Sequence, residues 1–274
     1  MTRIIFIAMC CIASVLTSCT SYKAVSKQSV VTAGSVEFDC ILTVGDRPFY
    51  FDSIYKSPAG EVYSVNNLKF FISDIAFSRS NTTERAAQSD SSIHGVYLVD
   101  FSEAKRDSIT GALRHATYYT MQTGAYSDVR FNIGVPRALN HSDPTQAPYP
   151  LNVGNTDMFW EWNSGYIFFL LEGVSTSAED SIIHLAIGGD SRIMPIGFGD
   201  IFNAVPLIQV KENMVTRVSV KLDLNKAFIN PDGSFYSFRP DEASVVHGGK
   251  YADILRLNLL QSIEFVSAES IPIK

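Results

Sequence analysis

Residues 36–44 read VEFDCILTV, and apolar side chains recur at every second position of this stretch. Successive side chains of a β-strand point to opposite faces. One face therefore carries the apolar set Val36, Phe38, Cys40, Leu42 and Val44. The same period recurs in residues 128–135, DVRFNIGV, and in residues 217–224, RVSVKLDL. Strands with one apolar face must pack that face against another layer, so the pattern predicts an all-β fold.

Several other short apolar segments are typical of strands, and turn-forming residues separate them. These segments are residues 68–77, 96–101, 166–171, 182–187, 206–210 and 262–266. Together they predict a single-domain two-sheet β-sandwich with long loops. The apolar spacing in residues 250–261 predicts one short C-terminal helix, and the polar segment 78–92 is expected to be a loop.

The N-terminus has the features of a targeting segment. Arg3 precedes an apolar run that is too short to span a bilayer permanently, and Leu-Thr-Ser-Cys ends it at Cys19. This pattern predicts a lipoprotein signal peptide at residues 1–18, lipidation of Cys19, a flexible tether at residues 19–34 and a folded domain at residues 35–274. An ordinary cleaved signal peptide is the alternative. The second residue after Cys19 is Ser21 rather than aspartate, so retention in the inner membrane is not signalled. We therefore expect an exported outer-membrane lipoprotein, on its periplasmic or its cell-surface side.

Charge and cysteine content narrow the function classes. The formal net charge is −6, and removal of residues 1–18 takes away only Arg3, which leaves −7. Nucleic-acid binding needs clustered Lys and Arg and is not expected. Cys40 is the one unmodified cysteine of the processed chain, so no internal disulfide can form. Its strand position predicts a buried, hydrophobic role.

The richest stretch is residues 131–171, which contains both tryptophans, Trp160 and Trp162. Strand-like segments flank a long loop with a histidine-containing turn and several prolines. Long loops in compact domains are usually functional or disordered. The aromatic content of this loop favours burial and order, so it is the first place to look for a functional site.

The chain contains five histidines and no familiar catalytic motif. We therefore expect a protein that is not an enzyme. Imidazoles gathered from distant segments can bind copper or zinc. His184 lies on a strand between apolar neighbours and is expected on a buried face, as a ligand or as a core histidine. His247 precedes two glycines and could reach a site or cap the following helix, whereas His94 and His115 are expected at the surface.

The central stretch resembles the signature of the MbnP family, exported copper-binding proteins encoded with di-haem peroxidases of the cytochrome c peroxidase type. The main segments are Phe131–Pro136, Ala138–Asp143, Ala147–Asn152 and Met158–Tyr166. Weaker similarity covers Leu68–Asp74, Tyr97–Asp100 and His184–Gly189.

The resemblance implies a mononuclear copper site built from histidines and a tryptophan that the partner peroxidase oxidises to kynurenine. On the matching positions, His141 and His184 are the expected ligands. Trp160 is the first candidate for oxidation and Trp162 the second, with packing between the sheets as the alternative. Met158 could offer a thioether to Cu(I), although a core role is the stronger expectation.

The resulting hypothesis is a lipid-anchored, extracytoplasmic copper-binding protein that acts in copper acquisition or handling. A second hypothesis is a metal-free surface lipoprotein that recognises a glycan or peptide through Trp160 and Trp162. A third, a hydrolase, has no supporting constellation in the sequence.

Overall fold

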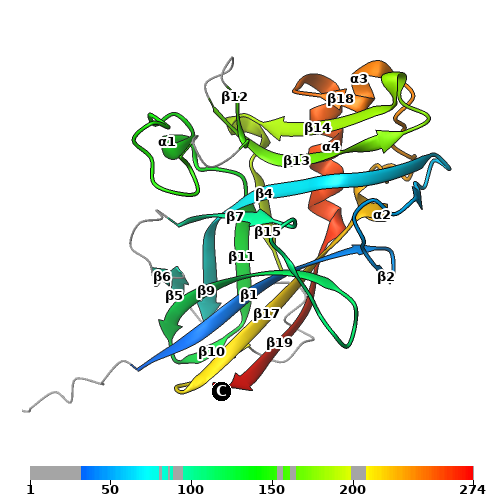
Figure 1. The fold of residues 1–274 in the computed structure, drawn as a ribbon. Coiled ribbons are helices and arrows are strands. Elements are labelled where there is room, and N and C mark those ends of the chain that lie inside the picture. The colour runs from blue at the N-terminus through cyan, green and yellow to red at the C-terminus, as the bar shows by residue number, and fades with distance from the viewer. Residues whose placement is uncertain are drawn as a thin grey trace, which may run out of the picture. The chain divides into compact units, whose positions relative to one another are not determined.

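The computed structural model describes residues 32–79, 82–85, 87–88, 95–152, 157–160, 165–198 and 208–273. Most of these residues lie in two β-sheets that pack face to face, which confirms the predicted β-sandwich (Figure 1). Cys19, Trp162 and His94 lie outside the described residues, as do the signal peptide and most of the tether.

The first sheet joins the two ends of the domain. Its order is β19 (Ile263–Pro272), β17 (Met214–Asp223), β1 (Ala33–Val44), β9 (Leu113–Gln122) and β6 (Ala87–Gln88). The short strands β2 (Arg47–Pro48) and β8 (Lys105–Arg106) pair with β1 and β9. β1 and β17 pair in parallel, from Ser35 with Val215 to Thr43 with Asp223, and they run side by side in Figure 1. The predicted apolar face of β1 is the buried one.

The second sheet is built around β4 (Val62–Arg79). Its order is β15 (Met194–Gly197), β11 (Asp128–Ile133), β4, β13 (Gly165–Ser175), β14 (Ile182–Gly188) and β18 (Val245–Val246). Four short strands pair along its length: β3 (Tyr55–Lys56), β5 (Thr82–Arg85) and β7 (Val96–Asp100) with β4, and β12 (Phe159–Trp160) with β13. A separate ribbon pairs β10 (Gly124–Tyr126) with β16 (Ile208–Val210).

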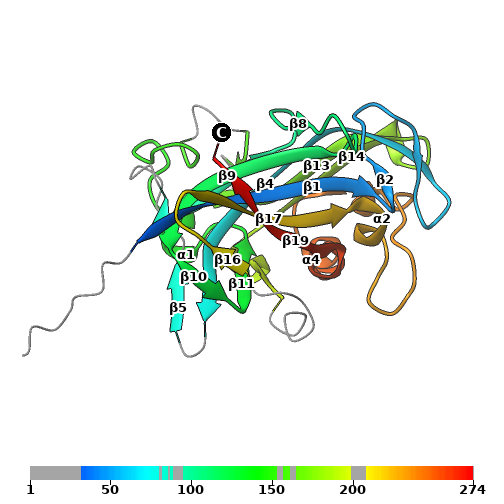
Figure 2. The same ribbon diagram turned by 90° about the horizontal axis from the view of Figure 1, so that it is seen from below.

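The helices are few and short. They are α1 (Arg137–Asn140), α2 (Leu224–Ala227), α3 (Asp241–Ser244) and α4 (Gly249–Ser262), with 3-10 turns η1 (Glu179–Ser181) and η2 (Asp190–Arg192). α4 is the predicted C-terminal helix, and its apolar side contacts strands of both sheets, such as β14 and β17. Figure 2 shows it nearly end-on beside β17 and β19. Within the described ranges, no helix is long and apolar enough to cross a bilayer.

Two local expectations were wrong. The segment 78–92 is not simply a loop, because β4 continues to Arg79 and the strands β5 and β6 follow. His115 is not a surface residue: it lies on β9 opposite Cys40, faces inward and is half-buried. Cys40 itself is 3% exposed, as predicted.

Candidate functional site

A long loop covers the outer face of the second sheet. Residues 134–164, here called the covering loop, connect β11 to β13, and their described parts are 134–152 and 157–160. Met158 and Trp160 of this loop are 0% and 5% exposed. They belong to a second apolar cluster that includes Phe71, Tyr166 and Phe168 from the sheet. The described parts of the loop are thus packed, and Met158 has the expected core position.

Trp160 lies against the backbone of β14. A Cβ atom added to Gly188 would be 2.6 Å from Cζ3 of the Trp160 ring and 2.5 Å from the Tyr166 carbonyl oxygen. Both distances are shorter than van der Waals contact, so the indole occupies the space that a side chain at position 188 would need. Glycine at this position is what lets Trp160 approach the sheet.

His141 follows α1 and contacts Asp190, the first residue of η2, which comes two residues after the end of β14. Its Nε2 atom is 2.8 Å from Oδ2 of Asp190, and the neighbouring Asn140 donates from Nδ2 to Oδ1 of the same carboxylate at 2.9 Å. Asn140 also accepts the backbone N–H of Tyr166 at 2.8 Å, which joins the loop to β13. Burial raises the pKa of Asp190, but the hydrogen bonds from His141 and Asn140 outweigh this effect and the pKa lies below its ordinary value.

A pocket of about 320 Å³ opens where these groups meet. Trp160, His141 and Asp190 all line it. The structure therefore brings together one predicted ligand and the tryptophan that the resemblance singles out. Sequence reasoning did not find Asp190 or Asn140.

His184 has different partners. Its Nδ1 atom is 3.0 Å from Oε1 of Glu172 on β13, and its ring lies 4.9 Å, between centroids, from that of His247. Burial lowers the pKa of His247, and the neighbouring His184 lowers it further. His184 is only half-buried, because the inward-facing residues of β14 are Ile183, Leu185 and Ile187. The expected buried face for His184 was wrong.

His141 and His184 belong to separate groups along β14. His141 contacts Asp190, which lies two residues beyond Gly188. His184 lies four residues before Gly188, and in a strand this places the Cα atoms of His184 and Gly188 roughly 13 Å apart. Within the parts of the chain that the structure describes, no three His, Cys, Asp or Glu side chains form a ready cage for a metal ion.

The donor atoms nonetheless fit the chemistry of a copper ion, the metal that the resemblance implies. Each of the two imidazoles is held through one ring nitrogen by a carboxylate, Asp190 for His141 and Glu172 for His184. Metal-ligating histidines commonly have such an outer partner, which fixes the ring and leaves the other nitrogen for the metal. Imidazole nitrogen is a suitable copper ligand.

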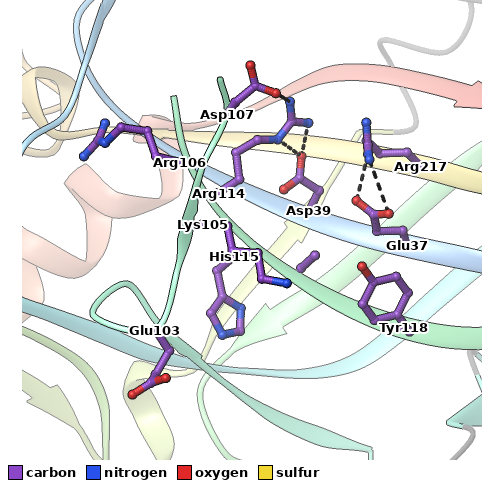
Figure 3. Close-up of a pocket in the computed structure, with 11 residues that line it drawn as sticks. Glu37, Asp39, Glu103, Lys105, Arg106, Asp107, Arg114, His115, Tyr118 and Arg217 are labelled. Atoms are coloured by element: carbon purple, nitrogen blue, oxygen red, sulfur yellow. Dashed lines mark hydrogen bonds and ion pairs between the residues drawn. The ribbon is translucent and has the colours of Figure 1, made fainter. Parts of the chain in front are cut away.

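A second polar cavity, of about 300 Å³, lies on the outer face of the first sheet (Figure 3). Two of its arginines, Arg114 and Arg217, form ion pairs with acidic residues of the lining. Arg114 pairs with the buried Asp39 and with Asp107, and Arg217 pairs with Glu37 (Figure 3). This pairing indicates a role in holding the sheet together.

His115, beside this cavity, predicts a pH effect on stability. Burial lowers the pKa of its imidazole, although Asp100, Asp39 and Glu103 act in the opposite direction. The folded state therefore binds this proton less readily than the unfolded chain, whose histidine pKa is about 6.5. Stability that comes from a neutral His115 is present above that pH and is lost as the pH falls through the lower, folded value.

We expect the free energy of unfolding to decrease between pH 7.5 and 5.0, and to decrease less in the variant His115→Gln. Urea unfolding at both pH values measures the difference. Equal decreases in the two proteins would mean that His115 does not carry this effect.

Comparisons with known proteins identify a family and a similar solved structure. A family model described as MbnP matches residues 33–245. The solved structure of MbnP from Methylosinus trichosporium is similar to this chain with a TM-score of 0.52, at 15% sequence identity, over 81% of this chain and 83% of that one. At this identity the likeness concerns the fold. No curated protein matches the chain.

Proposed function

The chain belongs to the MbnP family, and on that premise we propose that it is an exported copper-binding protein rather than a catalyst. The observation that carries the proposal is the pocket shared by the His141 imidazole and the Trp160 indole. The family membership and this pocket support copper as the cargo. Asp190 holds the imidazole in place, and its carboxylate is also paired with Arg137 at 3.5 Å.

Trp160 is the tryptophan that we propose is converted to kynurenine by a partner di-haem peroxidase. Two equivalents of peroxide, the oxidant of such a peroxidase, would open the indole ring to N-formylkynurenine with release of two waters. Hydrolysis would then remove the formyl carbon as formate and leave kynurenine, which has one carbon fewer, one oxygen more and a free aromatic amine. An amine nitrogen near an imidazole would give copper a second nitrogen donor, which this metal favours. Because Trp160 is 5% exposed, the oxidant would reach it through the pocket rather than across an open surface.

The same burial weakens the alternative of a glycan- or peptide-binding surface. A stacking platform needs an exposed ring face, and the Trp160 ring lies against Gly188 inside the second apolar cluster. We therefore favour copper. Attachment to the outer membrane through a lipid on Cys19 is part of the proposal, and replacement of Cys19 by serine should release the protein from membrane fractions.

Copper titration tests the proposal directly. We expect the full-length chain to bind copper, and His141→Ala to weaken binding by about tenfold or more, because one imidazole ligand is removed. His184→Ala, measured separately, shows whether the second histidine acts on the same ion. His115→Gln, in the other sheet, is the control and should bind as the wild type does.

Intact-mass measurement of protein from the native host should show the loss of a carbon and gain of an oxygen at one tryptophan. Fragmentation should place the change at residue 160. If the wild-type chain binds no copper, whether Trp160 is unmodified or oxidised, the proposed function is refuted.

A further inference from the structure

A polar row crosses the outer face of the second sheet. Asn67 on β4, Glu172 on β13 and His184 on β14 are register partners, so their side chains stand side by side on one face. β18 continues the row, because Val245 pairs with His184 in parallel. His247, two residues after Val245, returns to the same face, and its ring centroid lies 4.9 Å from that of His184.

Glu172 selects the tautomer of the neutral His184 imidazole. Its Oε2 atom accepts a hydrogen bond from Nδ2 of Asn67 at 2.7 Å, and its Oε1 atom lies 3.0 Å from Nδ1 of His184. A carboxylate accepts hydrogen bonds, so the proton of the neutral imidazole belongs on Nδ1. The lone pair is then on Nε2, the nitrogen that does not face Glu172.

The surroundings suit a cation. His184 and Glu172 have 27% and 36% of their side chains exposed, and His247 is exposed as well. An ion can therefore reach the pair and keep water ligands. The Glu172 carboxylate beside the pair reduces the electrostatic cost of a divalent charge there.

We propose that His184 and His247 together bind a late first-row divalent metal ion, Cu²⁺ ahead of Zn²⁺, with Glu172 as the positioning residue. Copper precedes zinc because nitrogen sites generally bind Cu²⁺ more tightly. The inference rests on the proposed copper function and gives His184 a specific second ligand, at a position outside the residues 33–245 that the family model matches. It also separates this pair from the His141–Trp160 pocket.

The test uses the full-length chain and competition with a chromophoric chelator for Cu²⁺ and Zn²⁺. We expect His184→Gln and His247→Gln each to weaken binding of both ions by about tenfold or more, and Glu172→Gln to weaken it by about tenfold. Glu172→Ala should have a larger effect than Glu172→Gln, since glutamine can still accept from Nδ1. Electron paramagnetic resonance of bound Cu²⁺ should show two imidazole nitrogens in the wild type and fewer in His247→Gln. Melting curves confirm that each variant is folded, and His115→Gln is the control.

The outcomes separate the two proposals. If the wild type and His247→Gln bind both ions equally, the inference is wrong. If copper binding is lost in His141→Gln but kept in His184→Gln and His247→Gln, the copper function stands and the two-histidine site is refuted. If the wild type binds neither ion, both proposals fail.

Discussion

Replacement of Trp160 by alanine is expected to lower the free energy of unfolding by about 3–5 kcal/mol, the range for removal of a large buried aromatic side chain. The indole is 5% exposed and fills the space above Gly188, so its loss leaves a cavity between the covering loop and β14. The loop should also be cut faster by proteases, because Trp160 belongs to the apolar cluster that packs the loop onto the sheet. Urea unfolding and limited proteolysis measure the two effects.

Ile182→Ala is the matched control for this change. Ile182 lies on β14 and is 49% exposed, so its truncation should change stability by no more than about 0.5 kcal/mol. A Trp160→Ala protein as stable as this control, with an equally protected loop, would show that the indole does not hold the loop on the sheet.

The second large effect is expected at the ion pair of Figure 3. Asp39 is 1% exposed, and its Oδ2 atom accepts from Nε of Arg114 at 2.8 Å and from Oγ of Ser219 at 3.1 Å. Arg114→Met leaves this buried carboxylate without its cation, which typically costs about 3–5 kcal/mol. Chemical denaturation at pH 7 gives the change in the free energy of unfolding.

Lys105→Met provides the comparison, because Lys105 lines the same cavity, is exposed and has no ion-pair partner in the described part of the chain. Lys105→Met should leave the free energy of unfolding nearly unchanged. The double variant Asp39→Asn/Arg114→Met should recover part of the loss, since no buried charge then lacks its partner. If Arg114→Met is as stable as Lys105→Met, the pair does not stabilise the sheet.

Local patterns in the sequence were sufficient for the fold class. Alternation in residues 36–44 and 217–224 identified the buried faces of β1 and β17, because burial acts on each strand with period two. Helical spacing in residues 250–261 found α4 to within one residue at each end. The strand β9 was missed, because its inward-facing positions include the polar His115 and Thr117, and its outward-facing positions include Ala116 and Tyr118.

Pairing between distant strands was beyond the reach of such patterns. Nothing local indicates that Ser35 lies beside Val215, because the choice depends on how the whole sheet is assembled. The face of His184 was misjudged for a related reason. Residues 182–187 are apolar at nearly every position, and a continuous apolar run has no period from which to tell the two faces apart.

At the candidate site, the resemblance identified His141 and Trp160, which share a pocket in the structure. The acidic partners escaped it, because Asp190 and Glu172 are ordinary residues in the sequence. Glu172 meets His184 through the register of β13 and β14, and Asp190 meets His141 only where the covering loop lies beside η2. Alternation does place Glu172 on the outer face. Its pairing with His184, however, depends on the register of the two strands, which is set by the geometry of the turn that connects them.

The parallel pairing of β1 with β17 has a consequence for biogenesis. The first strand of the domain finds this neighbour only after some 170 intervening residues have been made, and β17 in turn needs β19 at the C-terminus. The entropy of closing so large a loop is lost before the stabilising contacts between β1 and β17 form, so we expect this sheet to form late and slowly. A chain that stops before β17 would keep an open β1 edge and be prone to aggregate.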